Sequence, residues 1–354
     1  MRTRVVRIDA AAGPWPDLAE LGATVRDGGL VAIPTETVYG IAVNLRDEAA
    51  VRRLAQARGR ADDGPATVHL ADADDLVQHV REVPVAARRL AARLWPGPLT
   101  LVLSDRHGRP TGFRVPDLAP TRELLRLAGC RVGAVPAHPS GAPPALDAER
   151  VLEHFDGVLD AVLDAGACRH GAESTVVRVG PEGDVDVLRA GVVPVAEIRE
   201  AAARTLLFVC SANRCRSPLA AALATKLLAR RCGVNEWELA GAGYRVESAG
   251  TACLHGSPPT PEAESVAAER GMDISSHRAR PLTPSLVELA DEIYVMTRAQ
   301  RDSILEFAPE ARDRVRLLDR RGAEIPDPYG EGPLAYQRTA DLLLRALQER
   351  LDDL

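Results

Sequence analysis

An apolar run, a cysteine-containing loop and a helix-forming run follow one another in the middle of this chain, and together they restrict its local fold strongly. The run from Thr205 to Val209 is short and apolar, with β-branched residues at both ends, which predicts a buried strand. After Ser217 and Pro218, the sequence LAAALATKLLA favours a helix that opens with proline. The loop CSANRCR therefore lies at a helix N-terminus, where anions bind and a thiolate is stabilised.

From residue 205 to the end of the chain, strand-like and helix-like runs alternate regularly. Strands are expected at 205–209, 245–248, 292–296 and 315–318, and helices at 219–231, at 261–270, from 298 and at 334–351. This order predicts a small doubly wound parallel sheet, in which the loops at the carboxyl ends of the strands form the binding site.

The first half of the chain mixes strands and helices less regularly. Strand-like runs occupy 30–33, 99–103, 158–163 and 174–177, and helical runs occupy 48–57, 85–94 and 195–204. With 354 residues, 46% of them hydrophobic and 27% charged, the chain is long enough for two packed domains. We expect an α/β protein with a mixed-sheet domain at 1–200 and a parallel-sheet domain at 205–354.

Cysteine usage and charge exclude several classes of protein. The six cysteines have neither the spacing of a disulfide framework nor the paired spacing of a zinc site, so no bound metal is expected. The net charge of −6 argues against bulk attraction to nucleic acid or to a membrane, and no apolar run reaches membrane-spanning length. The sequence therefore predicts a reduced, cytoplasmic protein.

The loop between the central strand and helix has the composition of a phosphate-binding site that carries a nucleophile. Five residues separate Cys210 from Arg216, so backbone N–H groups can surround an oxyanion while the arginine binds two of its oxygens. The helix dipole and Arg216 favour the Cys210 thiolate, which can attack phosphorus and form a cysteinyl-phosphate. The leaving group needs a general acid, and the candidate is Asp327 in EIPDPYGEG, with Tyr329 as a wall of the pocket.

Together with Ser217, Pro218 and a terminal amphipathic helix, these residues resemble the low-molecular-weight protein tyrosine phosphatase family, which includes bacterial protein-arginine phosphatases. The resemblance covers residues 205–354. It implies that Cys210 is the nucleophile, Arg216 the phosphate ligand and Asp327 the general acid, acting on a phosphorylated protein without a cofactor. It also implies a supporting role around the loop for Ser211, Ala212, Asn213, Arg214, Cys215, Ser217, Ser248 and His277.

Three loop positions bear on the substrate and on redox behaviour. Ala212 stands where the family usually has glycine, so the backbone there must accommodate a Cβ atom. The position that faces the substrate is typically aliphatic in tyrosine phosphatases and threonine in arginine phosphatases, whereas here it is Arg214. Phosphotyrosine, phosphoarginine and small-molecule substrates therefore all stay open. We expect Cys215 to form a reversible disulfide with Cys210 that protects the nucleophile from over-oxidation.

The first half contains a run of hydroxyl side chains after a glycine turn and a strand, in GGLVAIPTETVYGIAVN. Thr35, Thr37 and Tyr39 alternate, which predicts that Thr37 and Tyr39 line one face of a cavity. With RLWPGPLTLVL and GAESTVV, this half resembles the YrdC-like family of threonylcarbamoyl-AMP synthases. Those enzymes join threonine, bicarbonate and ATP into an activated carbamate for tRNA adenosine modification. The resemblance implies an open, twisted mixed sheet around a large, positively charged cavity.

The resemblance also assigns ligands to the two ends of this cavity. It implies threonine binding by Thr37, His69, Arg114 and Ser174, and nucleotide binding by Arg58, Arg60, His138 and Arg189. ATP would be a substrate together with Mg²⁺, and the tRNA-modification machinery would be a partner. The nucleotide end departs from the family: its lysine–any–arginine signature is Arg58-Gly-Arg60 here, and its Pro-Ser-Ala-Asn stretch is Val135-Pro-Ala-His138.

These departures leave three interpretations of the first half open. It is a synthase that tolerates them, or a ligand-binding or regulatory module that controls the phosphatase half, or a YrdC-like domain with different nucleotide chemistry. Arginine is not equivalent to lysine at a phosphate contact, because a planar guanidinium and a compact ammonium group bind phosphate in different geometries.

Overall fold

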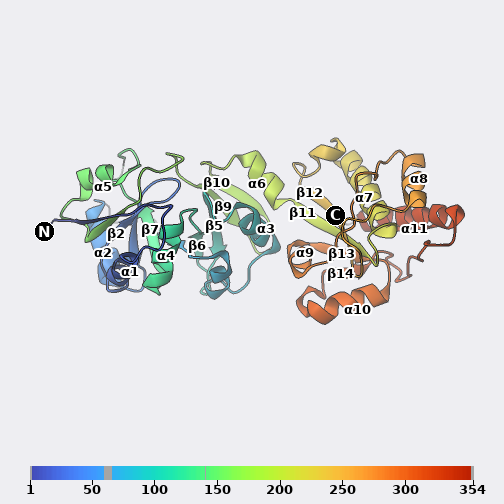
Figure 1. Ribbon diagram of the computed structural model, residues 1–354, viewed down its shortest axis with the longest axis horizontal. Helices are drawn as coiled ribbons and strands as arrows, with labels where there is room; N and C mark the ends of the chain where they lie inside the picture. The colour runs from blue at the N-terminus through green and yellow to red at the C-terminus, as the bar shows by residue number, and fades with distance from the viewer. Residues whose placement is uncertain (1, 60–65, 140, 352–354) are drawn as a thin grey trace. The chain divides into compact units, whose positions relative to one another are not determined.

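The computed structural model describes residues 2–59, 66–139 and 141–351, and the chain divides into two compact units, Met1–Ile198 and Arg199–Leu354 (Figure 1). The division falls within helix α6 (Val195–Ala202), near the residues where the sequence predicts a short helix between the two halves. In the described part of the chain, no helix is both long and apolar enough to cross a membrane.

The first unit is built on one mixed sheet, to which its described residues contribute ten strands. These are β1 (Arg4–Arg7), β2 (Val31–Ile33), β3 (Gly40–Asn44), β4 (Thr67–His69), β5 (Leu99–Ser104), β6 (Pro110–Arg114), β7 (Val132–Pro136), β8 (Ala161–Asp164), β9 (Thr175–Val179) and β10 (Val185–Arg189). Their order across the sheet is β1-β8-β2-β3-β7-β4-β6-β5-β9-β10. Parallel pairs such as β5 with β9 and antiparallel pairs such as β5 with β6 both occur.

Helices cover both faces of this sheet. They are α1 (Leu18–Arg26), α2 (Glu48–Ala57), α3 (Val85–Leu94), α4 (Ala119–Ala128) and α5 (Ala148–Phe155). Leucines of α1 and α4 pack with Val31 and Ile33 on one face. Apolar residues of α2 and α5 pack with Ala32 and Val43 on the other face. Because neighbouring strand residues point to opposite faces, β2 contributes to both cores and is buried throughout.

Two segments of the first unit differ from the sequence-based expectation. Strand β8 begins at Ala161 rather than at Val158, because the N–H groups of Val158 and Leu159 both bond to the Phe155 carbonyl oxygen and form a turn. The hydroxyl run at 34–39 is a loop between β2 and β3 rather than the end of a strand. In this loop Thr35 Oγ1 donates to the Val38 carbonyl oxygen at 2.6 Å, so its side chains do not alternate as in a strand.

The second unit is built on a parallel sheet with the order β12-β11-β13-β14. The strands are β11 (Arg204–Cys210), β12 (Tyr244–Gly250), β13 (Glu292–Val295) and β14 (Val315–Leu317). The helices are α7 (Arg216–Cys232), α8 (Pro261–Glu269), α9 (Pro284–Leu289), α10 (Arg298–Phe307) and α11 (Pro333–Leu351). The register pairs Cys210 with Gly250 at the carboxyl ends of β11 and β12, which places the predicted nucleophile at the edge where loops converge.

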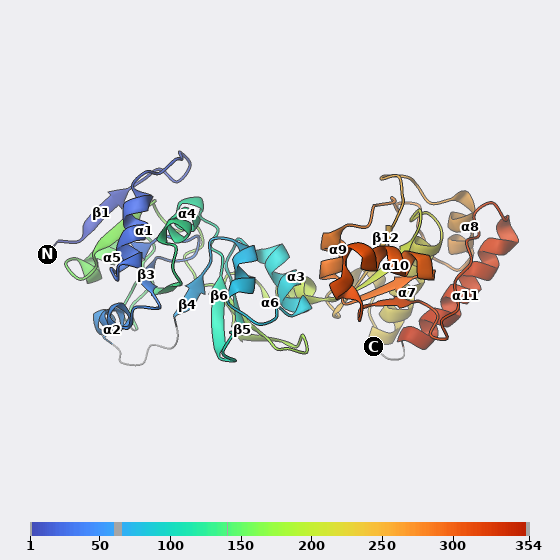
Figure 2. The ribbon, with the colours of Figure 1, turned by 90° about the horizontal axis from the view of Figure 1, so that it is seen from below.

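Alternate residues of β11 serve two cores on opposite faces of this sheet. Leu206 and Phe208 pack with residues of α7, α8 and α11, whereas Leu207 and Val209 pack with residues of α9 and α10 (Figure 2). The predicted α/β class, with a mixed sheet in the first half and a small parallel sheet in the second, is confirmed.

Candidate functional sites

The loop from Ser211 to Cys215 joins the end of β11 to the first turn of α7 and surrounds the sulfur of Cys210. Cys210 is fully buried, and its Sγ lies 3.0 Å from Ser217 Oγ. The backbone N–H of Asn213 donates to the same sulfur at 3.3 Å. The sulfur therefore lies among hydrogen-bonding groups, immediately before the loop that leads into the N-terminus of α7.

Asn213 holds the loop in shape. Among the described non-glycine residues it is the one with a positive φ, 53°, which asparagine tolerates better than most residues. Its Nδ2 donates to Ser217 Oγ at 2.8 Å and to Ser248 Oγ at 2.9 Å, and its Oδ1 accepts from the Arg280 N–H at 2.9 Å. The left-handed position is thus 213 rather than 212, which explains how the loop accommodates the side chain of Ala212.

His277 supports the same residue from outside the loop. Its Nε2 lies 2.8 Å from the carbonyl oxygen of Asn213. Burial lowers the pKa of His277, and the charges of Arg280 and Arg278 lower it further against this hydrogen bond. The neutral ring therefore donates through Nε2–H, because a carbonyl oxygen can only accept.

Arg216, the first residue of α7, forms an ion pair with Asp327. The Arg216 side chain is only 3% exposed, whereas that of Asp327 is 47% exposed. Arg216 Nη1 also donates to the Ile325 carbonyl oxygen at 3.1 Å, but its buried Nε has no hydrogen-bond acceptor in the described structure. The guanidinium is therefore fixed in place and keeps an N–H group that can bind an anion in the loop.

Cys215 has a different environment from Cys210. All six cysteines are free thiols. Cys215 Sγ lies 3.8 Å from Asp327 Oδ1. Burial, and then the nearby Cys210 and Asp327, raise the pKa of the Cys215 thiol to about 12. Cys215 is therefore a thiol at neutral pH, and both the nucleophilic role of Cys210 and the disulfide between the two cysteines stay predictions.

Three further residues predicted for the phosphatase site, Ser211, Arg214 and Tyr329, have partners of their own. Arg214 Nε donates to the Pro258 carbonyl oxygen at 2.8 Å. Ser211 Oγ accepts from Gln300 Nε2 at 3.1 Å. Tyr329 is 67% exposed, and its backbone N–H donates to Asp327 Oδ1 at 3.3 Å. These contacts bring all the predicted phosphatase residues to one edge of the sheet.

Sequence reasoning missed three residues of this site: Gly250, Arg280 and Gln300. A Cβ atom on Gly250 would lie 2.6 Å from the Ser211 carbonyl oxygen, so only glycine fits beneath the loop. Arg280 bonds through Nε to the Ser248 carbonyl oxygen at 2.8 Å, in addition to its backbone bond to Asn213. Gly250 and Arg280 stand in VESAG and in ISSHRAR, next to predicted residues, but only the fold brings them against the loop.

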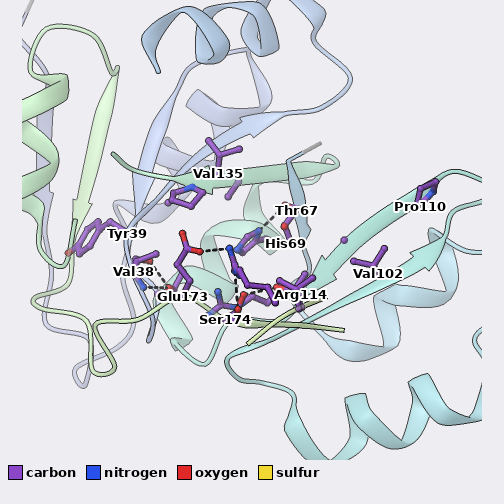
Figure 3. Close-up of a pocket in the computed structure, with 18 residues that line it drawn as sticks. Val38, Tyr39, Thr67, His69, Val102, Pro110, Arg114, Val135, Glu173 and Ser174 are labelled. Atoms are coloured by element: carbon purple, nitrogen blue, oxygen red, sulfur yellow. Dashed lines mark hydrogen bonds and ion pairs between the residues drawn. The ribbon is translucent and has the colours of Figure 1, made fainter. Parts of the chain in front are cut away.

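The first unit contains a cavity of about 360 Å³ over the centre of its sheet. Figure 3 shows His69 and Arg114 in this cavity, with Tyr39 on one side and Val102 and Pro110 on the other. Of the residues predicted to bind threonine, His69, Arg114 and Ser174 line it, and of those predicted to bind the nucleotide, Arg189 lines it.

Thr37 lies behind this cavity wall rather than in it. It is fully buried, and its Oγ1 accepts from Arg114 Nη2 at 2.8 Å. The same nitrogen donates to Oε1 of Glu36, at 2.5 Å, and both side chains of this ion pair are buried. Arg114 Nε is buried without a partner in the described structure. Thr37 and Glu36 thus orient Arg114, and the remaining N–H of Arg114 can bind an anionic ligand.

Hydrogen bonds also orient two polar side chains that line the cavity with Arg114, those of His69 and Ser174. His69 Nδ1 lies 2.9 Å from the Thr67 carbonyl oxygen. Burial, and then the charge of Arg114, lower the pKa of His69 to about 4, so the neutral ring donates through Nδ1–H and keeps Nε2 as an acceptor. Ser174 Oγ lies 2.8 Å from Thr100 Oγ1.

The predicted nucleotide residues divide between two places. Arg189 forms an ion pair with Glu173 and donates from Nη2 to the Ser174 carbonyl oxygen at 2.9 Å. Arg58 Nε lies 3.3 Å from the carbonyl oxygen of His138, so these two residues lie together, but neither lines the cavity. Arg60 lies outside the described residues.

Among residues 2–59, 66–139 and 141–351, no group of three or more His, Cys, Asp and Glu side chains is arranged to hold a metal ion.

Comparison with known proteins relates the first unit to one family. Residues 23–191 match the model of the Sua5–YciO–YrdC family, which is described as telomere recombination. A threonylcarbamoyl-AMP synthase of Pyrococcus abyssi is 40% identical over 185 residues, which are 50% of this chain and 54% of that protein. A Mycobacterium leprae protein, whose name places it among these synthases, is 36% identical over 196 residues, 52% of this chain and 86% of that protein.

A solved structure agrees with this similarity. It is that of a Sua5 variant from P. abyssi, with 31% sequence identity and a TM-score of 0.53. The match covers 58% of this chain and 71% of the P. abyssi chain. The chain spans about half the length of the P. abyssi and Bacillus subtilis synthases that it matches.

The second unit is similar to a different family. Residues 205–354 match the model described as low molecular weight phosphotyrosine protein phosphatase. A Ralstonia nicotianae protein, whose name assigns it to the low molecular weight protein-tyrosine-phosphatases, is 38% identical over 145 residues. The match covers 41% of this chain and 91% of that protein.

Proposed function

This chain belongs to the Sua5/YrdC family through its first unit and to the low molecular weight protein phosphatase family through its second, and from that premise we propose that it is a bifunctional enzyme. The second unit hydrolyses phosphorylated proteins, and the first condenses threonine, bicarbonate and ATP into threonylcarbamoyl-AMP. A reducing, cytoplasmic compartment suits both reactions, because the free thiol of Cys210 must stay reduced to act.

The phosphatase reaction is carried by the buried Cys210 sulfur with its hydrogen-bond donors. The thiolate attacks phosphorus, the bond from phosphorus to the leaving group breaks, and Asp327 gives its proton to that group. Water then attacks the cysteinyl-phosphate, Asp327 takes a proton from it, and the thiolate and inorganic phosphate are released. No metal is required, because the loop amides and Arg216 neutralise the developing charge.

The ion pair between Arg216 and Asp327 links phosphate binding to the acid step. A phosphate bound to Arg216 competes with the Asp327 carboxylate for the same Nη2. Asp327 is half exposed and can move away, whereas Arg216 is buried and fixed. A substrate dianion beside the displaced carboxylate favours its protonated form, which is the form a general acid needs.

The cysteine mechanism is tested with p-nitrophenyl phosphate. We expect wild-type protein to hydrolyse it and Cys210→Ser to lose at least about a thousandfold in kcat, because a serine hydroxyl stays protonated where the thiol ionises. Cys232→Ser, which removes another free thiol on α7, is the matched control and should behave as wild type. Hydrolysis that continued undiminished in Cys210→Ser would exclude this mechanism.

The synthase activity is supported by the oriented Arg114 and neutral His69 in the first cavity. We propose that Arg114 Nε binds the carboxylate of threonine and that Arg189, at the cavity edge, contacts the nucleotide. The altered signatures lie outside this set: Pro136 offers no hydroxyl, and His138 Nδ1 lies 2.9 Å from the Pro139 carbonyl oxygen.

Threonine-dependent release of pyrophosphate from ATP, in the presence of bicarbonate, is the direct assay for the first unit. We expect release by wild-type protein, a loss of at least about tenfold in Arg189→Gln, and no change in Arg178→Gln, a surface control paired with Asp186 on the same sheet. Absence of release from a sample that still hydrolyses p-nitrophenyl phosphate would assign the first unit to ligand binding or regulation instead.

A further inference from the structure

Gln300 connects the start of α10 to the loop from Ser211 to Cys215, and the proposed phosphatase reaction gives it no role. It is the third residue of the helix and is only 5% exposed. Strands β11 and β13 are parallel neighbours, so the loop after β11 and the helix after β13 meet at the same edge of the sheet. A buried amide here needs partners for both its oxygen and its NH₂ group, and those partners define what it does.

The amide oxygen of Gln300 closes the N-terminus of α10. Its Oε1 accepts from the backbone N–H groups of Met296 at 2.9 Å and Thr297 at 3.2 Å. Thr297 Oγ1 accepts in return from the Gln300 N–H at 3.3 Å, which completes a capping box. Because a backbone N–H can only donate, the atom that faces these two groups has to be the amide oxygen. The other end of the amide is therefore the NH₂ group.

This NH₂ group faces the first residue of the loop. Gln300 Nε2 lies 3.1 Å from Ser211 Oγ, and because an amide nitrogen can only donate, the hydroxyl oxygen accepts. A hydroxyl group that accepts in this way keeps its own proton for another partner. In the described structure the Ser211 hydroxyl proton has no acceptor, so it remains available to a ligand.

Ser211 is held from both sides, next to the proposed reaction centre. Its carbonyl oxygen accepts from the Ala252 N–H at 3.0 Å on the side of β12, and Gln300 holds its side chain on the side of β13. Ser211 directly follows Cys210, against whose sulfur the phosphoryl group of a substrate has to lie. Ser211 is partly exposed, so a ligand can reach it, and a hydroxyl that donates to a charged oxygen forms a short, strong hydrogen bond.

The helix cap alone does not explain why residue 300 is glutamine. A glutamate at this position would form the same capping box and add the negative charge that a helix N-terminus favours. Towards Ser211, however, an ionised carboxylate can only accept. It would take the hydroxyl proton for itself and place a negative charge beside the bound phosphate. The donor to Ser211 is thus the property that glutamine supplies and glutamate lacks.

We propose that Gln300 is a positioning residue of the phosphatase site, which directs the Ser211 hydroxyl to donate its proton to an oxygen of the phosphoryl group. This inference rests on the proposed phosphatase function. The bond forms when the phosphorylated substrate binds and persists during the reaction. It therefore contributes to phosphate binding more than to the chemical step.

The test compares Gln300→Glu and Ser211→Ala with the wild-type full chain at pH 7. The two measurements are p-nitrophenyl phosphate hydrolysis and calorimetric titration with inorganic phosphate. We expect the KM and the Kd of phosphate to rise at least about tenfold in each variant, while kcat changes less than about threefold. Gln300→Glu keeps the helix cap, so its unfolding temperature should not fall below that of wild type. Gln348→Glu, at an exposed position of α11, is the charge-matched control and should leave KM and Kd unchanged.

A double variant separates the role of Ser211 from simple charge repulsion. If Gln300→Glu acts by taking the Ser211 proton, it should raise KM by a smaller factor in a Ser211→Ala background than in wild type. An equal factor in both backgrounds would overturn the proposal, because Gln300 would then act without Ser211.

Two other results would also overturn the proposal. Wild-type KM and Kd in Gln300→Glu would reduce Gln300 to a helix cap, and wild-type values in Ser211→Ala would show that the phosphate does not use this donor. Failure of the proposed function gives a different result, namely no turnover by wild type, or undiminished turnover by Cys210→Ser. The phosphate titration needs no turnover, so it decides the role of Gln300 in that case as well.

Discussion

Asn213 is the residue on which the geometry of the phosphate loop depends most. It combines a left-handed backbone with three side-chain hydrogen bonds that reach Ser217, Ser248 and the backbone of Arg280. Replacement by alanine removes all three bonds and forces a Cβ-bearing residue without a compensating side chain to keep φ at 53°. The change tests whether this network, rather than the strand and helix on either side, holds the loop.

The expected cost follows from these contacts. A buried hydrogen bond contributes about 1 kcal/mol, so the three bonds give about 3 kcal/mol. The left-handed conformation costs a further 1 kcal/mol or so for alanine. Asn213→Ala should therefore lower the free energy of unfolding of the second unit by about 4 kcal/mol. For a unit of this size, that corresponds to a fall of about 8–16 °C in the temperature at which it unfolds.

The assay follows thermal unfolding of the full chain by circular dichroism, because activity itself depends on the loop, and compares Asn213→Ala with Asn213→Gly. Both variants lose the same bonds, but glycine adopts a positive φ freely. Glycine should therefore be at least as stable as alanine here, whereas at an ordinary helix or strand position it is about 0.5–1 kcal/mol less stable. Alanine within 1 kcal/mol of wild type, or clearly more stable than glycine, would refute this reasoning.

Two further predictions concern sterics and pH. Gly250→Ala should abolish phosphatase activity, because the new Cβ atom would lie 2.6 Å from the Ser211 carbonyl oxygen. The control is Gly241→Ala, whose Cβ atom would have its nearest contact, the Glu238 carbonyl oxygen, at 3.4 Å. Equal activity of the two variants would contradict this description of the loop. The pKa of His69 is about 4 in the folded unit and 6.5 ordinarily, so protons bind the unfolded state preferentially and stability falls as the pH drops from 6.5 towards 4. The free energy of unfolding falls by at most about 2 kcal/mol at pH 5, because the ring borders a cavity that water can enter. The measurement is urea unfolding at pH 7 and at pH 5. The difference in free energy of unfolding between the two pH values should be smaller for His69→Gln than for wild type.

The second unit was largely predictable from its sequence because its key residues are close together in the chain. The apolar run, the loop and the helix formers from Thr205 onward specify β11 and α7 locally, and the proposed nucleophile, Cys210, is the last residue of β11. Asp327 was predictable from its motif. Its ion pair with Arg216 was not, because the two residues are 111 positions apart and only the parallel sheet brings their segments together.

The first unit was less predictable because its strands are short and their partners are distant in sequence. Three-residue strands such as β2 and β4 carry little periodic signal, and β2 pairs with β8, whose residues lie about 130 positions later. The alternation of Thr35, Thr37 and Tyr39 suggested a strand, but local hydrogen bonds to Thr35 Oγ1 turn the chain instead. Glu36, the partner of Arg114, gave no signal of its own within that run.

Both proposed sites rely on a buried arginine that a carboxylate orients and whose Nε has no protein acceptor in the described structure. In the first unit, Glu36 is as buried as Arg114, and its second oxygen accepts from the Asp117 N–H at 2.8 Å. Breaking such a buried pair costs about 3–5 kcal/mol, so Glu36 stays in place and Arg114 serves as a fixed ligand. In the second unit, Asp327 is half exposed and water can replace the contact it gives up. The same pairing is therefore permanent where the proposed role is only to position a substrate, and exchangeable where the proposed role of the carboxylate is also to transfer a proton.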